Sequence, residues 1–297
     1  MTFPANVATE SQAAQKQAAT GAPSLLRPFY WSVRRELWES RYIYIAPLGV
    51  AAVFLLAFAI AYPLHHRRQP MTLPYEVSAA LIMGSALLVG LFYTLDALYS
   101  ERRDRSILFW KSLPVSDLTA VLSKLTIPLV IVPLLSFAIT IVTQFLMLLL
   151  GSAVRLGTGL SVAELWSQPA PFLQVSLTLL YHIVLVHGLW YAPLYGWLLL
   201  VSAWSPRAPL VWAVLPPFVV CGVEKLAVNT TYALAWLQER FLGPQSHSGM
   251  ANNASRDLVA QLIPVHFFSE PGLWIGLAIA VVLMAGAVRL RRYRGPI

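Results

Sequence analysis

The residues of this chain that could perform chemistry are few and lie far apart in the sequence. His182 and His187 are five residues apart in an apolar stretch, so they fall on different faces of a helix and lack the i, i+4 spacing of a helical metal pair. Glu224 and Lys225 are adjacent and also point in different directions from a helix. Because ionisable groups inside membranes tend to be functional, these four residues leave open an ion-coupled carrier or an intramembrane enzyme. Packing and interfacial roles are the simpler interpretation.

The familiar catalytic and nucleotide-binding motifs are missing from the sequence. It contains no Gly-x-x-x-x-Gly-Lys-Ser/Thr loop, no dinucleotide-binding glycine run and no Gly-x-Ser-x-Gly elbow. The single cysteine, Cys221, excludes an internal disulfide and any Cys-x-x-Cys motif. We therefore expect no catalytic residue, metal site or cofactor in this chain. Any energised work then needs a partner or an ion gradient.

The most informative segment runs from Tyr99 to Asp117, between two apolar stretches. A mixed-charge patch, Glu101 to Arg105, is followed by the apolar and aromatic run Ile107 to Trp110, and Leu113-Pro114 ends the local helix. Ser116 is expected to cap the next helix. The pattern predicts a short rigid helix that seats in a groove of a soluble partner, with aromatic anchors for affinity and charges for orientation. A basic loop that only obeys membrane topology rules would explain the same pattern.

The elements that position these residues are predicted to be membrane helices. Of the 297 residues, 58% are hydrophobic and only 11% are charged, against roughly 25% charged in soluble domains. A helix that spans a bilayer needs roughly 20 mostly apolar residues. Six stretches meet this requirement and predict an all-α integral membrane protein with about six transmembrane helices: Tyr42–Tyr62, Val77–Leu98, Leu125–Leu150, Phe172–Trp204, Leu210–Val228 and Leu273–Leu290. The fourth is long for one span, and Pro193 is expected to kink it.

The distribution of positive charge predicts the orientation. Most of the 21 Lys and Arg residues precede the first span, follow the last span, or lie in the connections after spans two and four. Because Lys and Arg resist translocation, both termini and the Tyr99–Asp117 connection are predicted to be cytoplasmic. Membrane topology thereby accounts for the net charge of +8 without nucleic acid as a partner. The polar residues 1–24 are expected to form a disordered cytoplasmic tail.

Two further segments are predicted to be helical outside the spans. Between Ser24 and Arg41, apolar residues are interleaved with charges, which fits an interfacial helix on the inner leaflet. Its candidate membrane-contacting residues are Phe29, Trp31, Arg34, Arg35 and Trp38. A basic flank that only anchors the first span is the alternative. Between spans five and six, Tyr232 to Leu237 and Leu258 to Phe268 are apolar but too short to span, which predicts an outer helical insertion.

One motif in the chain resembles a known family. The pair Glu101-Arg102, Ser106, the run Leu113-Pro114-Val115-Ser116 and Lys124 look like the corresponding segment of membrane subunits of type-2 ABC transporters, also called ABC transporter permeases. The predicted interfacial helix, six spans, cytoplasmic ends and outer insertion are similar to that family's architecture over nearly the whole chain. The resemblance implies a single transmembrane permease domain over residues 25–297, with its ATPase on a separate chain.

The resemblance also implies partners. The permease would dimerise, most simply as a homodimer, and bind two copies of an ABC ATPase that holds ATP and Mg²⁺. The segment seated on the ATPase would be a coupling helix comprising Glu101, Arg102, Asp104, Arg105, Ile107, Leu108, Phe109, Trp110 and Lys111. Glu101→Arg or Trp110→Ala is then expected to reduce copurification of the ATPase while folding stays intact.

The expected location and cargo complete the hypothesis. A bacterial inner membrane is the location that the resemblance implies. The spans offer apolar and aromatic surface with little buried charge, which favours export of an amphipathic or hydrophobic substrate. A membrane anchor that transmits signals for an ATPase without moving cargo is a further alternative.

Overall fold

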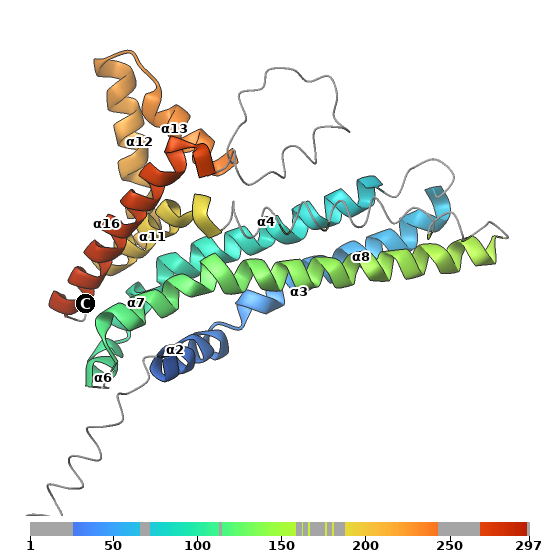
Figure 1. Ribbon diagram of the computed structural model, residues 1–297, viewed down its shortest axis with the longest axis horizontal. Helices are drawn as coiled ribbons and strands as arrows, with labels where there is room; N and C mark the ends of the chain where they lie inside the picture. The colour runs from blue at the N-terminus through green and yellow to red at the C-terminus, as the bar shows by residue number, and fades with distance from the viewer. Residues whose placement is uncertain are drawn as a thin grey trace, which may run out of the picture.

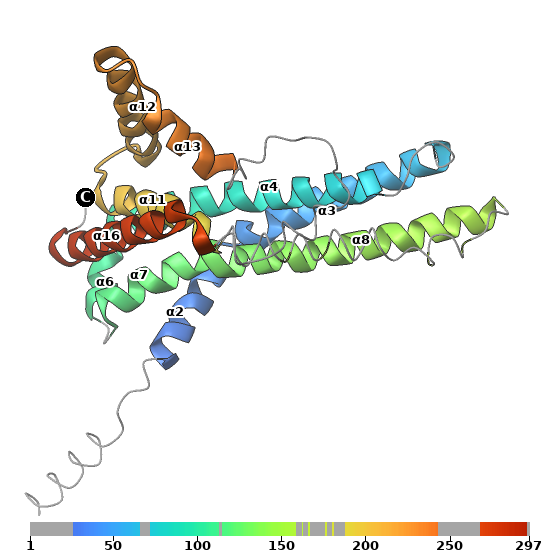
Figure 2. The ribbon, with the colours of Figure 1, turned by 45° about the horizontal axis from the view of Figure 1, so that its top comes forward.

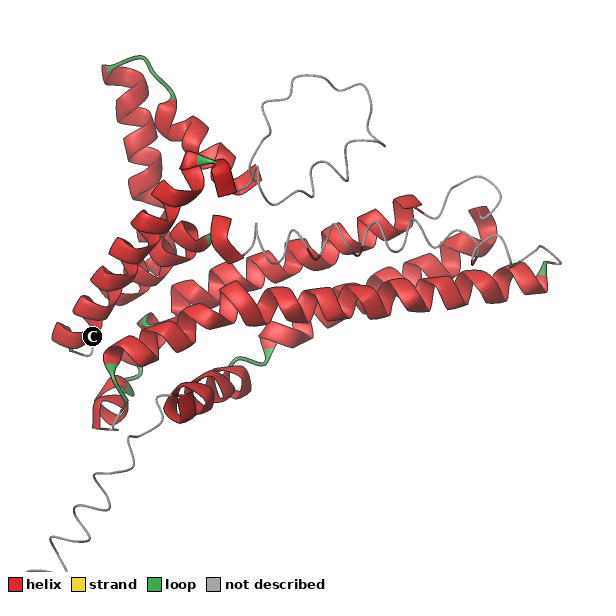
Figure 3. Ribbon diagram, viewed as in Figure 1, coloured by secondary structure: helices red, strands yellow, loops and turns green. Residues whose placement is uncertain are grey.

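The computed structural model describes residues 26–65, 72–112, 115–158, 188–242 and 268–295, together with residues 162, 166, 176 and 180. These residues are mostly helical and include no strand (Figure 3). Within this part of the chain, five helices are long and apolar enough to cross a membrane. The prediction of an all-helical transmembrane protein is therefore confirmed in its general character. The predicted tail, residues 1–24, lies outside the described residues.

The helices follow the predicted apolar stretches. They are α2 (Leu26–Glu39), α3 (Tyr42–His65), α4 (Thr72–Ala97), α5 (Tyr99–Arg103), α6 (Ile107–Ser112), α7 (Asp117–Thr126), η1 (Ile127–Ile131), α8 (Val132–Gly157), α11 (Ala192–Trp204), α12 (Pro209–Ala227), α13 (Tyr232–Leu242) and α16 (Pro271–Tyr293). Predicted spans one, two, five and six correspond to α3, α4, α12 and α16. Of the fourth, Phe172–Trp204, the structure describes mainly α11, which has 13 residues. The total of six spans therefore stays a prediction.

The fourth stretch is interrupted near its proline. Residues 188–190 form a π-helical turn, the chain bends at Tyr191, and α11 begins with Pro193 in its first turn. Because proline has no N–H, it costs least in the first turn of a helix, where that N–H would have no partner within the helix. Pro193 therefore marks the start of a new helix, where the sequence predicted a kink within one.

The third stretch is part of a much longer helix. α7, η1 and α8 form one continuous helix of 41 residues, Asp117–Gly157. At about 1.5 Å per residue it is about 60 Å long, against roughly 30 Å of bilayer hydrocarbon. The helix begins at Asp117, and the preceding residue, Ser116, caps it. The hydroxyl of Ser116 accepts a hydrogen bond of 3.1 Å from the backbone N–H of Thr119, so the predicted cap is confirmed. Pro128 lies in the π-helical segment η1, where its missing N–H disturbs the regular ladder.

The helices pack in two groups. α3, α4 and α8 pack together, α11 packs against α16, and α4 and α7 join the groups (Figures 1 and 2). A Cβ at Gly196 of α11 would lie 3.4 Å from the carbonyl oxygen of Ala280 of α16, so a small residue permits this close approach. α12 and α13 project from the side of the bundle (Figures 1 and 2).

The largest apolar core lies where most of the helices meet. It includes buried side chains from α3, α4, α7, η1, α8, α11 and α16, among them Ile43, Tyr93, Leu98, Val121, Ile127, Val132, Leu199 and Ala287. α2, α5, α6, α7 and the last turn of α16 lie together near this core, while α8 ends at the opposite extreme (Figures 1 and 2). We call this part of the molecule the α6 end.

Candidate functional site

A sharp turn sets α6 apart from the long helices. α4 ends at Ala97, and the hydroxyl of Ser202 on α11 accepts hydrogen bonds of 2.9 Å from the backbone N–H groups of Leu98 and Tyr99. Arg105, between α5 and α6, has a left-handed backbone with φ of 59°. This conformation is uncommon for residues other than glycine, and here it reverses the chain between two short helices. The single short helix predicted from the sequence is thus divided into α5 and α6.

α6 presents two apolar side chains on its outer side. Leu108 and Phe109 are each 59% exposed, whereas Ile107 is only 1% exposed. Asp104 and Arg105, in the preceding turn, are exposed as well. Exposed apolar side chains rimmed by charge are typical of surfaces that bind another protein. Leu108 and Phe109 are therefore the predicted docking residues that a partner can reach and bury.

The other sides of α6 are fastened to α2 and α16. The guanidinium carbon of Arg35, on α2, lies 3.7 Å from the ring centroid of Trp110. The ammonium group of Lys111 donates hydrogen bonds to the backbone carbonyls of Arg292 and Arg294, 3.2 and 3.4 Å away, at the end of α16. Trp110 and Lys111 therefore hold α6 against α2 and α16, so α6 is a helix fixed by tertiary contacts and not an unattached loop.

Behind α6 lies a group of charged side chains, four of them buried and two partly exposed, that we call the ion cluster. It comprises Arg35, Glu36, Glu101, Asp117, Lys124 and Arg291. Lys124 Nζ lies 2.9 Å from Glu36 Oε1 and 3.2 Å from Glu101 Oε1. Arg291 contacts Glu101 at 3.4 Å and also pairs with Asp117. Because its members come from α2, α5, α7 and α16, the ion cluster ties four helices together.

The ion cluster is balanced in charge, with three carboxylates facing three cations. The hydroxyl of Tyr93 donates a hydrogen bond of 2.7 Å to Glu36 Oε2. Burial raises the pKa of Glu36, but the charges of Lys124 and Arg35, together with hydrogen bonds from Lys124 and Tyr93, lower that pKa to about 2. Such pairing is what makes buried charge tolerable. Beside the cluster, α2, α6 and α7 border a cavity of about 260 Å³.

The sequence analysis did not find the ion cluster, although helical spacing carries a signal of it. Glu36 follows Val33 by three positions, and Lys124 follows the fully buried Val121 by three. Arg291 follows the buried Ala287 by four positions. Residues three or four apart share a helix face, so each charge extends an apolar face inward. From the sequence, Lys124 was interpreted as part of the permease-like motif and, like Arg291, as a charge that sets the topology.

Three of the predicted docking residues are buried and cannot touch a partner directly. Glu101 belongs to the ion cluster, and Ile107 is turned inward. Arg102 Nη1 donates to the backbone carbonyls of Ala203 and Ser205, 2.7 and 3.2 Å away. The last carbonyls of a helix lack donors within that helix, so Arg102 caps the end of α11. These three residues can only position α6.

α2 has the amphipathic character predicted for an interfacial helix. Trp31 and Trp38 are exposed and flank Arg34, whose guanidinium carbon lies 5.2 and 4.9 Å from their ring centroids. Phe29 is half-buried, and Arg35 points inward to the ion cluster and Trp110. Indole rings next to a cation suit the boundary between lipid and water. The helix is confirmed, and its place on a membrane stays a prediction.

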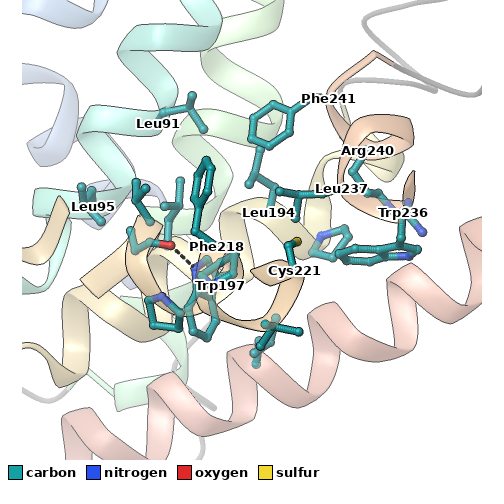
Figure 4. A pocket seen from close by; sticks show the side chains of 18 of the residues that line it. Leu91, Leu95, Leu194, Trp197, Phe218, Cys221, Trp236, Leu237, Arg240 and Phe241 are labelled. Carbon is teal, nitrogen blue, oxygen red and sulfur yellow. Dashed lines mark hydrogen bonds between the residues drawn. The ribbon is translucent and has the colours of Figure 1, made fainter. Parts of the chain in front are cut away.

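A second region has the opposite character: an apolar cavity of about 530 Å³ beside α11 and α16. Residues at i, i+3 or i+4, and i+7 share one helical face, and three helices turn such a face to the cavity (Figure 4). These residues are Leu88, Leu91 and Leu95 on α4, Val214, Phe218 and Cys221 on α12, and Ala233, Leu237 and Arg240 on α13. We call this space the apolar cavity.

A backbone carbonyl next to the apolar cavity is satisfied by a side chain. Pro217 lies inside α12 and has no N–H, so the carbonyl of Ala213 lacks its usual helical donor. The indole Nε1 of Trp197 donates to that carbonyl at 3.0 Å, as the dashed line in Figure 4 shows. The polar group that the proline frees is thereby paired, and the wall stays apolar.

Arg240 is the charged residue at one end of the apolar cavity, and it is 4% exposed. Its guanidinium carbon lies 4.2 Å from the ring centroid of Trp190 and 5.3 Å from that of Trp236. It donates hydrogen bonds to the backbone carbonyls of Trp190 and Gly272. Among the described residues it has no carboxylate at ion-pair distance, although the charge of the neighbouring Glu239 acts on it. The rings of Trp190 and Trp236, which we call the aromatic cage, contact this cation without neutralising its charge.

The remaining candidate residues are placed as follows. Glu224 accepts hydrogen bonds of 2.6–2.7 Å from the hydroxyl of Thr230 and from the first N–H groups of α13, so it links α12 to α13. Lys225 is exposed, and His182 and His187 lie outside the described residues. Within the described part, no three His, Cys, Asp or Glu side chains gather as a metal site. Comparison of the chain with protein-family models, curated proteins and solved structures found no match.

Proposed function

We propose that the chain is a permease subunit of an ATP-driven transporter, of the type-2 ABC kind that its Glu101 to Lys124 segment resembles. A separate ATPase docks on α6. The observation that carries this proposal is the exposed pair Leu108 and Phe109 on a helix whose other sides are fastened. A few buried apolar anchors supply most of the energy of an interface, and rim charges such as Asp104 and Arg105 orient the partner.

A fastened α6 can transmit a push from the ATPase. The ion cluster joins α5 to α2, α7 and α16, and α7 continues without a break into α8. A displacement of α6 therefore moves the long α7–α8 helix and α16 together. Rigid-body movement of this kind switches access in many transport and allosteric systems. The ATPase holds ATP and Mg²⁺, and this chain supplies the path of the transported molecule across the membrane.

The proposed setting is a bacterial inner membrane, with two copies of this chain and two ATPase subunits. α2, α6 and the end of α16 lie together, which supports a common cytoplasmic side (Figures 1 and 2). The exposed Trp31 and Trp38 of α2 suit the headgroup layer on that side. The cargo is an exported amphipathic or hydrophobic molecule.

The double variant Leu108→Asp/Phe109→Asp tests the docking surface. Both side chains are exposed, so we expect normal expression and melting temperature. Buried unpaired carboxylates in the interface should lower recovery of a co-expressed partner ATPase by about tenfold or more. Leu156→Asp is the matched control, because Leu156 is 69% exposed near the opposite extreme of α8. Equal copurification of the ATPase with both variants would refute docking on α6.

Two further measurements refine the proposal. Glu101→Arg is unsuited to testing docking, since a fourth cation beside Arg35, Lys124 and Arg291 would disrupt the ion cluster and with it the fold. Transport into inverted vesicles distinguishes a permease from a signal transmitter. A transmitter would hydrolyse ATP in the complex without accumulating solute in the vesicles.

A further inference from the structure

The apolar cavity has the dimensions of a binding site that docking on α6 does not use. Its volume of about 530 Å³ lies within the roughly 300–1,000 Å³ of small-molecule sites, which are mostly apolar with a few placed polar groups. α4, α12 and α16 border it, and all three are long and apolar enough to cross a membrane. A ligand dissolved in the lipid could therefore reach it without crossing water.

The walls of the apolar cavity suit a hydrocarbon chain. Leu91, Phe218 and Cys221 converge on it from two helices (Figure 4). The carbonyl of Ala213 is already paired with Trp197. Water is a poor occupant, because a buried water needs several polar partners. Phe218 and Leu88, which line the space, are 66% and 55% exposed, so the cavity is open to the surroundings of the helices and a hydrocarbon chain can enter it.

One end of the apolar cavity has a different chemistry. Arg240 lies there as a buried cation held by the faces of Trp190 and Trp236 and by two backbone carbonyls. Carbonyls and indoles carry no net charge, so among the described residues nothing at ion-pair distance balances the charge of the guanidinium. A buried cation is stabilised most by a hydrogen-bonded anion, and guanidinium matches phosphate and carboxylate in geometry.

We propose that the apolar cavity binds an amphiphile that has one hydrocarbon chain and an anionic headgroup. The chain lies between α4 and α12, and the headgroup lies at Arg240. This inference deepens the proposed function by naming the class of cargo, and it rests on that function only for the link between binding and transport. Binding itself requires no ATPase, so the two proposals fail separately.

Photo-crosslinking of the full chain in phosphatidylcholine nanodiscs tests the site. The probe is hexadecyl phosphate with a diazirine in its chain, and mass spectrometry locates the labelled residues. We expect labels on the cavity faces of α4 and α12, with unlabelled hexadecyl phosphate displacing the probe at about tenfold lower concentration than hexadecanol. Equal displacement by the two competitors, or labels on positions of α12 outside the cavity such as Val211, Val219 and Val223, would overturn the proposal.

Two pairs of variants locate the chain and the headgroup. Cys221→Phe fills the cavity and should lower labelling about tenfold, while Val223→Phe, at an exposed position of the same helix, should not change it. Arg240→Gln should abolish the preference for the phosphate, and Arg240→Lys should retain part of it. If Arg240→Gln fails to fold, the competition on the natural chain still decides the headgroup. Full labelling of Cys221→Phe would exclude the cavity.

Discussion

The ion cluster and the apolar cavity both contain buried cations, but they compensate them in opposite ways. Lys124 lies between two carboxylates, 2.9 and 3.2 Å away. Arg240 lies near two indole rings and, within the described part of the chain, donates to two backbone carbonyls. The charges of the first arrangement balance one another and join four helices, although Arg35 Nε and Arg291 Nε make no hydrogen bond. The second leaves a charge beside an open space of about 530 Å³. The ion cluster is therefore expected to stabilise the packing of its four helices, whereas our proposal assigns the charge of Arg240 to a ligand.

The largest effect should come from breaking the completed arrangement. Lys124→Met removes the cation that Glu36 and Glu101 share and leaves two buried carboxylates short of a partner. We expect a loss of about 3–5 kcal/mol of stability, because removing one partner of a buried ion pair exposes the full desolvation penalty of the other. Thermal unfolding in detergent measures it.

A matched variant shows whether the missing charge causes this loss. In the double variant Glu36→Gln/Lys124→Met, Glu101 keeps Arg291 as a partner, and the glutamine can still accept a hydrogen bond from Tyr93. We therefore expect the double variant to melt above Lys124→Met. If Lys124→Met has the same melting temperature as the natural protein, the ion cluster does not stabilise the fold and the contrast between the two regions is wrong.

A smaller effect should follow from crowding the aromatic cage. A Cβ at Gly276 of α16 would overlap the guanidinium of Arg240. The side chain of Arg240 must then move, at a cost of about 1–3 kcal/mol, and the preference for hexadecyl phosphate over hexadecanol should weaken. Gly222→Ala on α12 is the control, since a Cβ there meets nothing within 4 Å. Unchanged stability and preference in Gly276→Ala would show that the position of Arg240 is unimportant.

The sequence predicted the elements whose causes are local. The spans that became α3, α4, α12 and α16 follow from runs of apolar residues, because such a helix satisfies its own backbone in lipid. The cap at Ser116 follows from its hydroxyl preceding α7. Pro193, in the first turn of α11, is also a local signal for the start of that helix. The sequence alone did not show that the apolar stretch bends at Tyr191.

The two regions compared above depend on contacts that the sequence does not encode locally. Glu36 and Lys124 are 88 positions apart, and only the packing of α2 on α7 brings them within 2.9 Å. For the apolar cavity, the spacing on α4 and α12 predicts apolar faces, but two such faces can either interlock or leave space between them. The covering of Ala213 by Trp197 likewise requires the tertiary arrangement.

The dependence of stability on pH separates the two regions by their chemistry. The pKa of Glu36 is about 2 in the fold against an ordinary value of 4.5, so the carboxylate stabilises the protein fully above about pH 4.5 and loses that contribution as the pH falls towards 2. The melting-temperature difference between the natural chain and Glu36→Gln should therefore be constant from pH 8 to pH 5 and shrink below pH 4.5. The deficit of Gly276→Ala has a steric cause and should stay the same throughout. A Glu36→Gln difference that changes between pH 8 and pH 5 would mean that Glu36 is not held by Lys124 and Arg35 as described.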